Sequence, residues 1–524
     1  MDWASQPDPF RRYPGAQLVE LTRGLAPGAR AFADLYEGDM RPVPVDGQSV
    51  GVFLRHSMGL SAWKVTGRAR WPLRVNPSSG NLHPTEAYIV HAGRVSHYAP
   101  REHALEERAH LGVAVWDHFS AGRTGFLVAL TSIHWREAWK YGERAFRYCQ
   151  HDVGHAIGAL RMAAAWHGWH LVPLPVWSDA QLAAVLGTDR AADRPGAAER
   201  EEPEYVAVVT PEDPAAWLAA DPEGLVAEAR DAAWRGVANQ LSPHHADWAA
   251  IDRVSETTRY PGLAHVPSDA SVTVGSSSAA RRAPSPPVSP AGDAPSGVRA
   301  DHVILGRRSA VAFDARSSLP LHRFLSMLAR LQPGAPPWDA IEWPPQVHLA
   351  VFVHRVEGLT PGAYAYLRDD TTQPAWRAAM RSEFLWEHVP DDPTGRLFLL
   401  LPIGVTDAAR RVSCDQDIAA DGFFSLGMIA RCTASLRDRG EWFYRRLFWE
   451  CGLIGQVLYL EAEAAGARGT GIGCFYDDAV HELLGLSGHD WQSLYHFSMG
   501  VAVEDARLTT EPGYAWESTP RDRS

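Results

Sequence analysis

The chain of 524 residues is 46% hydrophobic and 21% charged, and it contains 20 tryptophans. This composition excludes a disordered protein, and the length suits roughly two to four globular domains. The 62 acidic residues outnumber the 50 basic ones and give a net charge of -12, which argues against nucleic acid or an anionic membrane as a partner.

The N-terminus, MDWASQPDPFRRYP, lacks the basic flank and apolar segment of a secretory signal, and no run of about 18 apolar residues follows. We therefore expect a cytoplasmic protein. The cysteines are odd in number and form no CxxC pair, so we expect free thiols, with neither a zinc site nor a disulfide framework. They are Cys149, Cys414, Cys432, Cys451 and Cys474.

Two polar motifs come early in the chain. RVNPSSGNLHPTEAYIV at 74–90 places a Pro-Ser-Ser-Gly-Asn loop before an apolar run, and WKYGERAFRY at 139–148 contains one of only two lysines, Lys64 and Lys140. Arginine cannot lose its proton whereas a desolvated lysine can, so a lysine kept in an arginine-rich chain marks a position where a titratable amine matters. A surface lysine kept by chance is the alternative.

A long helix is predicted after the second motif, and it carries His151, Asp152 and His155. The two histidines share a helix face at a spacing that can bind metal. No third ligand follows at a motif spacing, so we predict a core or interface role and no metal site.

The chain divides into two halves. Residues 268–299 are Ser, Pro, Ala and Gly with almost no large apolar residue, which predicts a disordered linker between halves at 1–267 and 300–524. FRYCQHDVGHAIGALRMAAAWHG at 146–168 aligns with YRRLFWECGLIGQVLYLEAEAAG at 444–466, which lies 298 residues later. Such a repeat predicts a duplicated unit, paired about a pseudo-twofold axis like a dimer fused into one chain.

Each half is predicted to mix helices and strands. Apolar residues at helical spacing indicate that both long segments are buried central helices. The shift of 298 also pairs WSDAQLAAVLG at 177–187 with FYDDAVHELLG at 475–485. The apolar runs EYVAVVT at 204–210 and LYHFSMGVAV at 494–503 follow and predict strands. The predicted fold class is therefore a duplicated α+β unit.

Two further motifs come from the second half. VILGRRSAVAFDARSSLPLHRFLSML at 303–328 contains an Arg-Arg-Ser segment, and GTGIG at 469–473 follows the second long helix. Together with PSSGN and KYGER, these motifs resemble the nitroreductase superfamily of flavoproteins over roughly residues 50–210 and 300–510. The Lys-Tyr, Gly-Glu-Arg, Arg-Tyr and Gly-His pattern resembles its SagB-type azoline dehydrogenases. The resemblance implies two domains of mainly antiparallel sheet with surrounding helices, and FMN as cofactor.

The resemblance also assigns the cofactor-binding residues. The phosphate of FMN would be bound by arginine forks and a hydroxyl from Arg307, Arg308 and Ser309, with Arg507 as a further cation. A turn with exposed amides would contact the N5 side of the flavin through Gly471, Ile472 and Gly473. The loop that approaches the flavin ring would consist of Pro77, Ser78, Ser79, Gly80 and Asn81. Each motif has an ordinary alternative: a solvated helix entry, a helix C-terminus with a glycine stop, or a type I turn.

The motifs are divided between the halves. The first half keeps PSSGN but has LVPLP at 171–175 where the second has GTGIG, and the second half has VHRVEGLTPGAYAY where PSSGN should fall. Nitroreductase dimers build each flavin site from both protomers. The complementary losses therefore predict one composite site between the two halves, with the other site dismantled.

The Lys140–Tyr141 pair has no lysine counterpart in SLRDRGEWFYRR of the second half. In azoline dehydrogenases such a pair is assigned to proton abstraction while the flavin accepts a hydride, which implies a lysine whose pKa is lowered by burial. Alternatively, Lys140 only pairs with Glu137, Glu143 or a flavin carbonyl.

We therefore expect an FMN-dependent dehydrogenase that oxidises a heterocycle or C–N bond in a biosynthetic pathway. One alternative is a nitroreductase-type reductase that uses NAD(P)H, and another is an inactive scaffold of a biosynthetic complex. The substrate is expected to be a small molecule or a peptide, and the protein a monomeric pseudo-dimer or a higher homo-oligomer.

Overall fold

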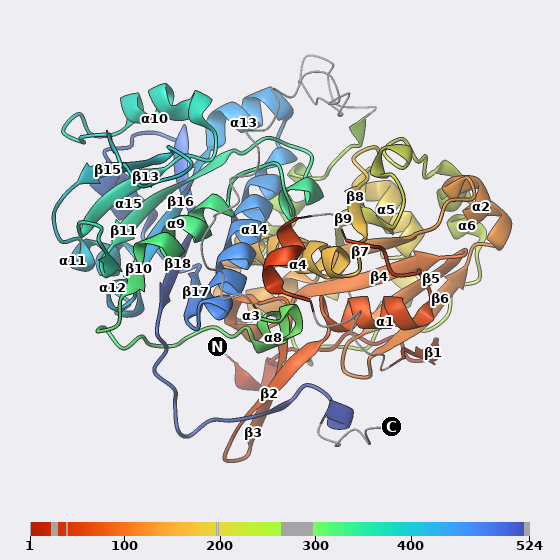
Figure 1. The fold of residues 1–524 in the computed structure, drawn as a ribbon. Helices are drawn as coiled ribbons and strands as arrows, with labels where there is room; N and C mark the ends of the chain where they lie inside the picture. The colour runs from red at the N-terminus through yellow and green to blue at the C-terminus, as the bar shows by residue number, and fades with distance from the viewer. Residues whose placement is uncertain are drawn as a thin grey trace. The chain divides into compact units, whose positions relative to one another are not determined.

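The chain forms two compact units (Figure 1). Unit 1 comprises residues 1–30, 34–267 and 505–524, and unit 2 comprises 31–33 and 268–504. The computed structural model describes residues 2–22, 30–37, 40–194, 196, 199–263 and 297–517. Of the predicted linker, residues 268–296 lie outside the described residues.

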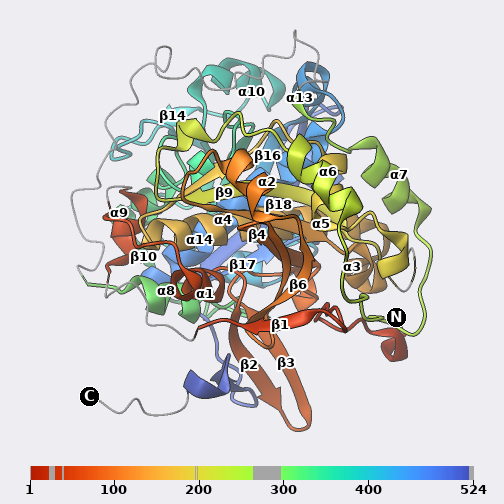
Figure 2. The same ribbon diagram turned by 90° about the vertical axis from the view of Figure 1, so that its right-hand side faces the viewer.

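The C-terminal segment does not belong to the second half, contrary to the expected boundary of 300–524. Strand β19 (Thr509–Pro512) pairs with β2 (Leu60–Thr66), which pairs in turn with β3 (Ala69–Arg74). β2 and β3 form a hairpin that projects from unit 1 (Figures 1 and 2). Tyr514 then anchors the segment, because its hydroxyl donates to the carbonyl of Pro100 at 2.7 Å.

Unit 1 is built on an antiparallel sheet that has, in its described part, seven strands in the order β1-β6-β5-β4-β7-β9-β8. Its strands are β1 (Gln17–Glu20), β4 (Thr85–His91), β5 (Arg94–Ala99), β6 (Ala104–His110), β7 (Phe126–Ser132), β8 (His170–Pro173) and β9 (Glu202–Thr210). Its helices are α1 (Gly47–Arg55), α2 (Val113–Ser120), α3 (His134–Tyr141), α4 (Ala145–Trp166), α5 (Asp179–Leu186), α6 (Glu223–Asp231) and α7 (Ala249–Thr257). Residues of α2, α5 and α6 form a core with one face of the sheet, and α4 packs on the sheet as well.

Unit 2 repeats this plan with the order β14-β15-β13-β11-β16-β18-β17. Its strands are β11 (Val347–Val353), β13 (Gly362–Tyr366), β14 (Glu387–His388), β15 (Leu397–Leu401), β16 (Phe424–Arg431), β17 (Arg468–Ile472) and β18 (Trp491–Gly500), with a separate pair, β10 (Leu319–Pro320) and β12 (Val356–Glu357). Its helices are α8 (Ala300–Gly306), α9 (Leu321–Ala329), α10 (Gln373–Ala379), α11 (Thr406–Val412), α12 (Ile418–Asp421), α13 (Cys432–Arg439), α14 (Phe443–Ala464) and α15 (Asp477–Leu484). Helix α14 packs against β11, β17 and β18.

The predicted repeat is confirmed. The bounds of α14 and α15 are those of α4 and α5 shifted by 298 residues, and strands β9 and β18 occur where the apolar runs predict them. Helices α3 and α13 obey the same shift, which the sequence did not reveal. The fold is therefore a duplicated α+β unit with an antiparallel sheet in each copy, as expected. Among the described helices, none has the length and apolarity that a membrane span requires.

Candidate functional site

The Pro-Ser-Ser-Gly-Asn loop of unit 1 is held by its own hydrogen bonds and by α4. Ser79–Asn81 form a short 3-10 turn in which Gly80 adopts a positive φ of 56°. The backbone N–H of Ser79 donates to Asp152 Oδ1 at 3.0 Å, and its hydroxyl donates to the same oxygen at 3.0 Å. The Asn81 amide donates to the carbonyl of Pro72 at 2.8 Å. These bonds fix the loop while Gly80 stays exposed at its tip.

The end of α3 lies against this loop. A Cβ atom on Gly80 would collide with the Tyr141 hydroxyl and would lie 3.1 Å from Lys140 Nζ. Lys140 Nζ lies 5.0 Å from the centre of the Tyr141 ring, which packs edge-on against Tyr148. The structure therefore brings the Lys-Tyr pair and the Pro-Ser-Ser-Gly-Asn loop together within unit 1.

The protonation environment of the pair differs from the expectation. Lys140 is exposed and Tyr141 half-buried, so the predicted burial of the lysine is wrong. Lys140 is the second-last residue of α3, where its long side chain reaches solvent. Burial raises the pKa of the Tyr141 phenol above its ordinary value, and the negative charge of Glu137 raises it further.

Two buried carboxyl groups lie beside the pair, and the sequence did not identify them as functional. Burial raises the pKa of Asp152 to about 7, because hydrogen bonds from the loop serines only partly offset the loss of water. Burial also raises the pKa of Glu137 well above its ordinary value, with the charge of Asp152 adding to the effect. The sequence singled out Asp152 only as a neighbour of two histidines, and Glu137 only as a partner of Lys140.

The Arg-Arg-Ser segment of unit 2 lies beside the glycine-rich motif. Ser309 forms a β-bridge with Gly469, and the N–H of Ala310 donates to the carbonyl of Gly469 at 3.2 Å. Arg307 is buried and its guanidinium lies 5.1 Å from the centre of the Tyr459 ring. Burial lowers the pKa of Arg307 to about 10, an effect that Tyr459 opposes and the Arg468 cation adds to. Two guanidinium groups and a hydroxyl thus gather at this place, and one of them, Arg468, forms an ion pair with Glu463.

Tyr459 joins the two motifs, and sequence reasoning missed it. Its hydroxyl lies 2.9 Å from Ser309 Oγ and accepts the N–H of Gly471 at 2.8 Å. Only its position on the central helix α14 could have drawn attention to it, and a helical tyrosine at apolar spacing looks like core.

GTGIG is not a turn, contrary to the sequence-based expectation. It lies in β17, an edge strand that pairs with β18. The glycines are required because side chains of β18 cross them: a Cβ atom on Gly469 would collide with Phe497, and one on Gly471 with the Tyr495 hydroxyl. Ile472 is buried and Gly473, just past the strand, is half-buried.

The two other predicted phosphate-binding arginines, Arg308 and Arg507, make local contacts. Arg308 donates to the carbonyl oxygens of Leu305 at 2.8 Å and Arg307 at 2.6 Å. Arg507 is exposed, donates to Asp505 at 2.7 Å and belongs to unit 1. Its role as a phosphate-binding cation stays a prediction.

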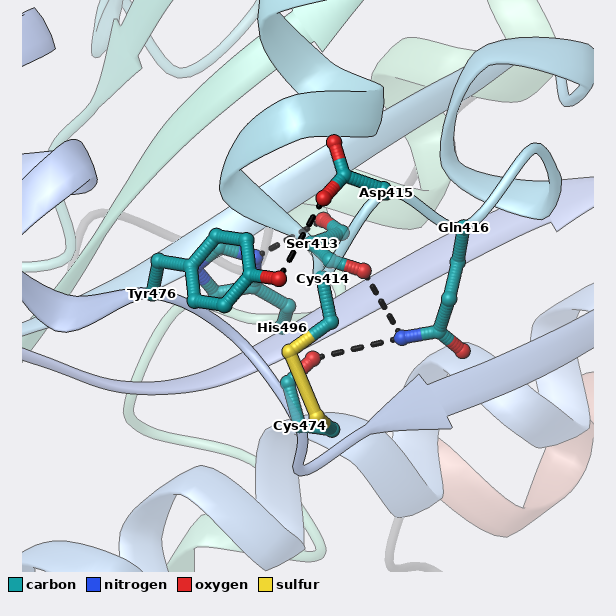
Figure 3. Close-up of a disulfide and its surroundings, with 7 residues drawn as sticks. All are labelled: Ser413, Cys414, Asp415, Gln416, Cys474, Tyr476 and His496. Carbon is teal, nitrogen blue, oxygen red and sulfur yellow. Dashed lines mark hydrogen bonds between the residues drawn. A yellow bond between two sulfur atoms is a disulfide. The ribbon is translucent and has the colours of Figure 1, made fainter.

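The expectation of free thiols is wrong for two of the five cysteines, because Cys414 and Cys474 form a disulfide with Cα atoms 5.9 Å apart (Figure 3). Cys474 follows the glycine-rich motif directly, and Gln416 bridges the carbonyls of Ser413 at 2.7 Å and Cys474 at 3.2 Å. Tyr476 adds a hydrogen bond to Asp415 at 3.2 Å. The disulfide thus ties the loop after α11 to the end of β17.

Comparison with known proteins supports the fold. The model of the nitroreductase family matches residues 62–198 and 304–501. The crystal structure of a protein named as a nitroreductase from Anabaena variabilis has 20% identical residues and a TM-score of 0.66, with 96% of this chain and 95% of that chain covered. At this identity the likeness shows the fold alone.

Two other structures match one half of the chain. A protein named as a nitroreductase from Ralstonia eutropha is 17% identical with a TM-score of 0.28, covering 41% of this chain and 88% of its own. The E. coli microcin synthetase McbBCD complex with truncated pro-MccB17 is 15% identical with a TM-score of 0.27, covering 38% of this chain and 69% of that chain. No curated protein matches the sequence. Because the family model matches more than half of the chain, once in each unit, the protein belongs to the nitroreductase family and is an oxidoreductase of that family in tandem form.

Proposed function

We propose that the protein is an FMN-dependent dehydrogenase of the SagB-like type, which oxidises a heterocycle or a C–N bond. The observation that carries this proposal is the contact of Lys140 and Tyr141 with Gly80 of the loop. An amine and a phenol at the tip of a loop that the family uses for flavin can take a proton from a substrate carbon or nitrogen. Exposure of Lys140 leaves it within reach of such a substrate.

The residues present fit FMN. Arg307 and the Ser309 hydroxyl supply a cation and a hydroxyl group, donors that suit a phosphate, whereas the nearby Arg468 already pairs with Glu463. Gly80 is exposed at the tip of the loop, which suits the approach of a flat ring. Bound FMN would supply the hydride acceptor. Because each motif is kept in one half only, we propose that the two sets serve a single FMN per chain.

The roles of the residues follow from this assignment. Arg307 and Ser309 bind the phosphate, the Ser78–Asn81 segment positions the ring, and Lys140 with Tyr141 moves the proton. The Gly471 N–H already donates to Tyr459, so we assign this glycine to close approach rather than to hydrogen bonding. The cytoplasmic location, the choice between small molecule and peptide, and the oligomeric state stay predictions.

The exposure of Lys140 also favours a second candidate, a reductase that uses NAD(P)H. An exposed ammonium can bind an anionic group of NAD(P)H or of a nitro compound without any proton transfer. The two candidates differ in the direction of electron flow: rapid anaerobic bleaching of bound FMN by NADPH would favour the reductase over the dehydrogenase.

Substitution of the two lysines tests the assignment. In the Lys140→Arg protein we expect FMN to remain bound while substrate oxidation slows by about 10²- to 10⁴-fold, the usual contribution of a general base. Lys64→Arg is the matched control, because Lys64 is the other lysine of the chain and donates to Thr510 at 2.7 Å on the β2–β19 pair. Wild-type turnover in Lys140→Arg would remove the lysine from the mechanism.

A further inference from the structure

Two carboxyl groups are buried below the Lys-Tyr pair, one on α3 and one on α4. Glu137 has no exposed surface and Asp152 is 1% exposed. Asp152 accepts two hydrogen bonds from Ser79 through Oδ1. For Glu137, the Ser78 hydroxyl is a hydrogen-bond donor that lowers its pKa, an effect smaller than that of burial. One such donor compensates little of the lost hydration, which marks Glu137 as a candidate for a role other than structure.

The spacing along α3 connects Glu137 to the pair. Lys140 and Tyr141 follow it by three and four residues, so the three side chains lie on neighbouring positions of one helix face. The positive charge of Lys140 lowers the pKa of Glu137, although burial and Asp152 raise it more. The amine, the phenol and both carboxyl groups are thus electrostatically coupled around the same loop.

Unit 2 shows what a structural carboxylate looks like at the equivalent position. The residue 298 positions after Asp152 is Glu450, which is also fully buried. Glu450 forms an ion pair with Arg368 and accepts hydrogen bonds at 3.1 Å from the indole of Trp343 and the backbone N–H of Val347. A cation and several donors keep this carboxylate charged and in place.

Unit 1 differs from unit 2 in the ion-pair partner of the buried acid and in the residue beside it on the preceding helix. In its described part, no ion pair includes Asp152, and the residue equivalent to Ser435 of α13 is a second acid, Glu137. One copy therefore buries a neutralised ion pair where the other buries two coupled acids. Two like charges that are buried beside each other oppose their joint ionisation, so the two acids titrate as a coupled pair.

We propose that Glu137 and Asp152 act as a shared proton store behind Lys140 and Tyr141, exchanging a proton with them during each turnover. This role rests on the proposed proton abstraction. When the Lys140 amine has taken a proton from the substrate, an N–H bond of the ammonium breaks and an O–H bond forms on the ionised carboxylate, directly or through a bridging hydroxyl or water. No electrons move in this step, and the amine is restored. The carboxyl group then returns the proton to solvent through Lys140, which is exposed, and is ionised again for the next turnover. Glu137 and Asp152 are positioning residues, because they act through the pair.

Other titratable groups face the store and enter any pH dependence. Lys140 and Tyr141 do so from α3. From α4, Tyr148 and Cys149 interact electrostatically with the store, and Arg144, Arg147 and His151 lie next to Tyr148. The charges of Glu137 and Asp152 raise the pKa of Cys149, after burial, and Glu204 of β9 acts in the same sense.

The two lysines of the chain make a direct experiment possible. We would label the full-length protein, without substrate, with an amine-acylating reagent across pH, and quantify Lys140 against Lys64 by peptide mass spectrometry. Removing a nearby negative charge should shift the midpoint pH of Lys140 labelling downward by roughly half a unit or more in Glu137→Gln and Asp152→Asn. The Lys64 profile should not move. Glu143→Gln is the comparison variant, because Glu143 is exposed and lies three residues after Lys140. Solvent screens its charge, so the shift of the Lys140 profile should be smaller than in either buried-acid variant, and the Lys64 profile should stay unchanged.

A second measurement tests the store itself. An acid whose pKa is raised in the folded state binds its proton more tightly there, so stability is full below the unfolded pKa and falls as pH rises toward the folded one. Wild-type stability should therefore fall between about pH 4 and the folded pKa of Asp152, which is about 7. Asp152→Asn should reduce the slope of the free energy of unfolding against pH by the equivalent of up to one proton, and Asp152→Glu should restore that slope.

The outcomes separate this proposal from the proposed function. Unchanged Lys140 labelling in both acid variants would overturn the proton store, whether or not FMN binds. If neither variant folds, the pH profile of Lys140 labelling in the wild-type protein is the test. A store that titrates near neutral pH should add an inflection to this profile there. A single smooth step would reject the proton store. Failure of the protein to bind FMN would reject the proposed function while the labelling result stands.

Discussion

The two units share a skeleton but differ at the strand that follows the central helix. In unit 1 this strand is β8, whose Val172 is buried in the core together with Leu174. In unit 2 it is β17, whose Gly469 and Gly471 bring the backbone within reach of Phe497 and Tyr495. The same strand thus supplies side chains to a core in one copy, while in the other its glycines make room for aromatic side chains of the neighbouring strand. We propose that duplication freed one copy of each motif to become structural while the other keeps the flavin-binding role.

The largest expected effect on stability comes from substitutions in this strand. Leu171, the counterpart of Gly469, is 2% exposed, so Leu171→Ala should cost about 2–5 kcal/mol in the free energy of unfolding without weakening FMN binding. Gly471→Ala should cost about 1–3 kcal/mol, because the new Cβ collides with Tyr495, and should also weaken FMN binding. Chemical denaturation and FMN titration of both variants measure this, and equal FMN affinities would abolish the distinction.

The disulfide is a second difference between the copies. The position equivalent to Cys474 in unit 1 is Val176, and the Cys414–Cys474 bond joins residues 60 apart in the sequence. Removing it with Cys414→Ser and Cys474→Ser together should lower the free energy of unfolding by about 2–4 kcal/mol. The doubly substituted protein should then no longer respond to a dithiol reductant. A wild-type protein whose stability does not change on reduction would contradict this prediction.

The phosphate-binding assignment of unit 2 carries a smaller expected effect. Arg307→Ala removes a charged donor and should weaken FMN binding by roughly 10- to 100-fold, which corresponds to about 1.5–3 kcal/mol. Arg437→Ala is the control, because that arginine is exposed and pairs with Asp438 at 3.3 Å. Fluorescence titration with FMN compares the two. Equal affinities would show that the phosphate lies elsewhere.

The regular elements could be predicted from the sequence because their signals are local. Helical spacing of apolar residues located α4 and α14, and the shift of 298 residues located α5 and α15. That GTGIG forms a strand could not be predicted, since its glycines are required by contacts with Phe497 and Tyr495 on a neighbouring strand. Cysteine counting likewise could not reveal a bond between residues 60 apart.

The candidate site was predicted in part. The Lys-Tyr pair and the Pro-Ser-Ser-Gly-Asn loop lie together in unit 1, and Arg307 and Ser309 lie beside GTGIG in unit 2. The roles of Asp152 and Tyr459 could not be predicted, because a buried acid or tyrosine in a central helix gives no sequence signal until its partners are known. The exposure of Lys140 was also hidden, since it depends on the position of the end of α3.

We propose that the chain binds a single FMN, because each motif is kept in one unit only. The most direct measurement is the number of FMN molecules bound per chain, obtained by titrating the purified protein with FMN and releasing the cofactor for quantification. One FMN per chain, bound more weakly in Arg307→Ala and unchanged in Lys140→Arg, is the expected result. Two FMN per chain would contradict the claim, and so would none.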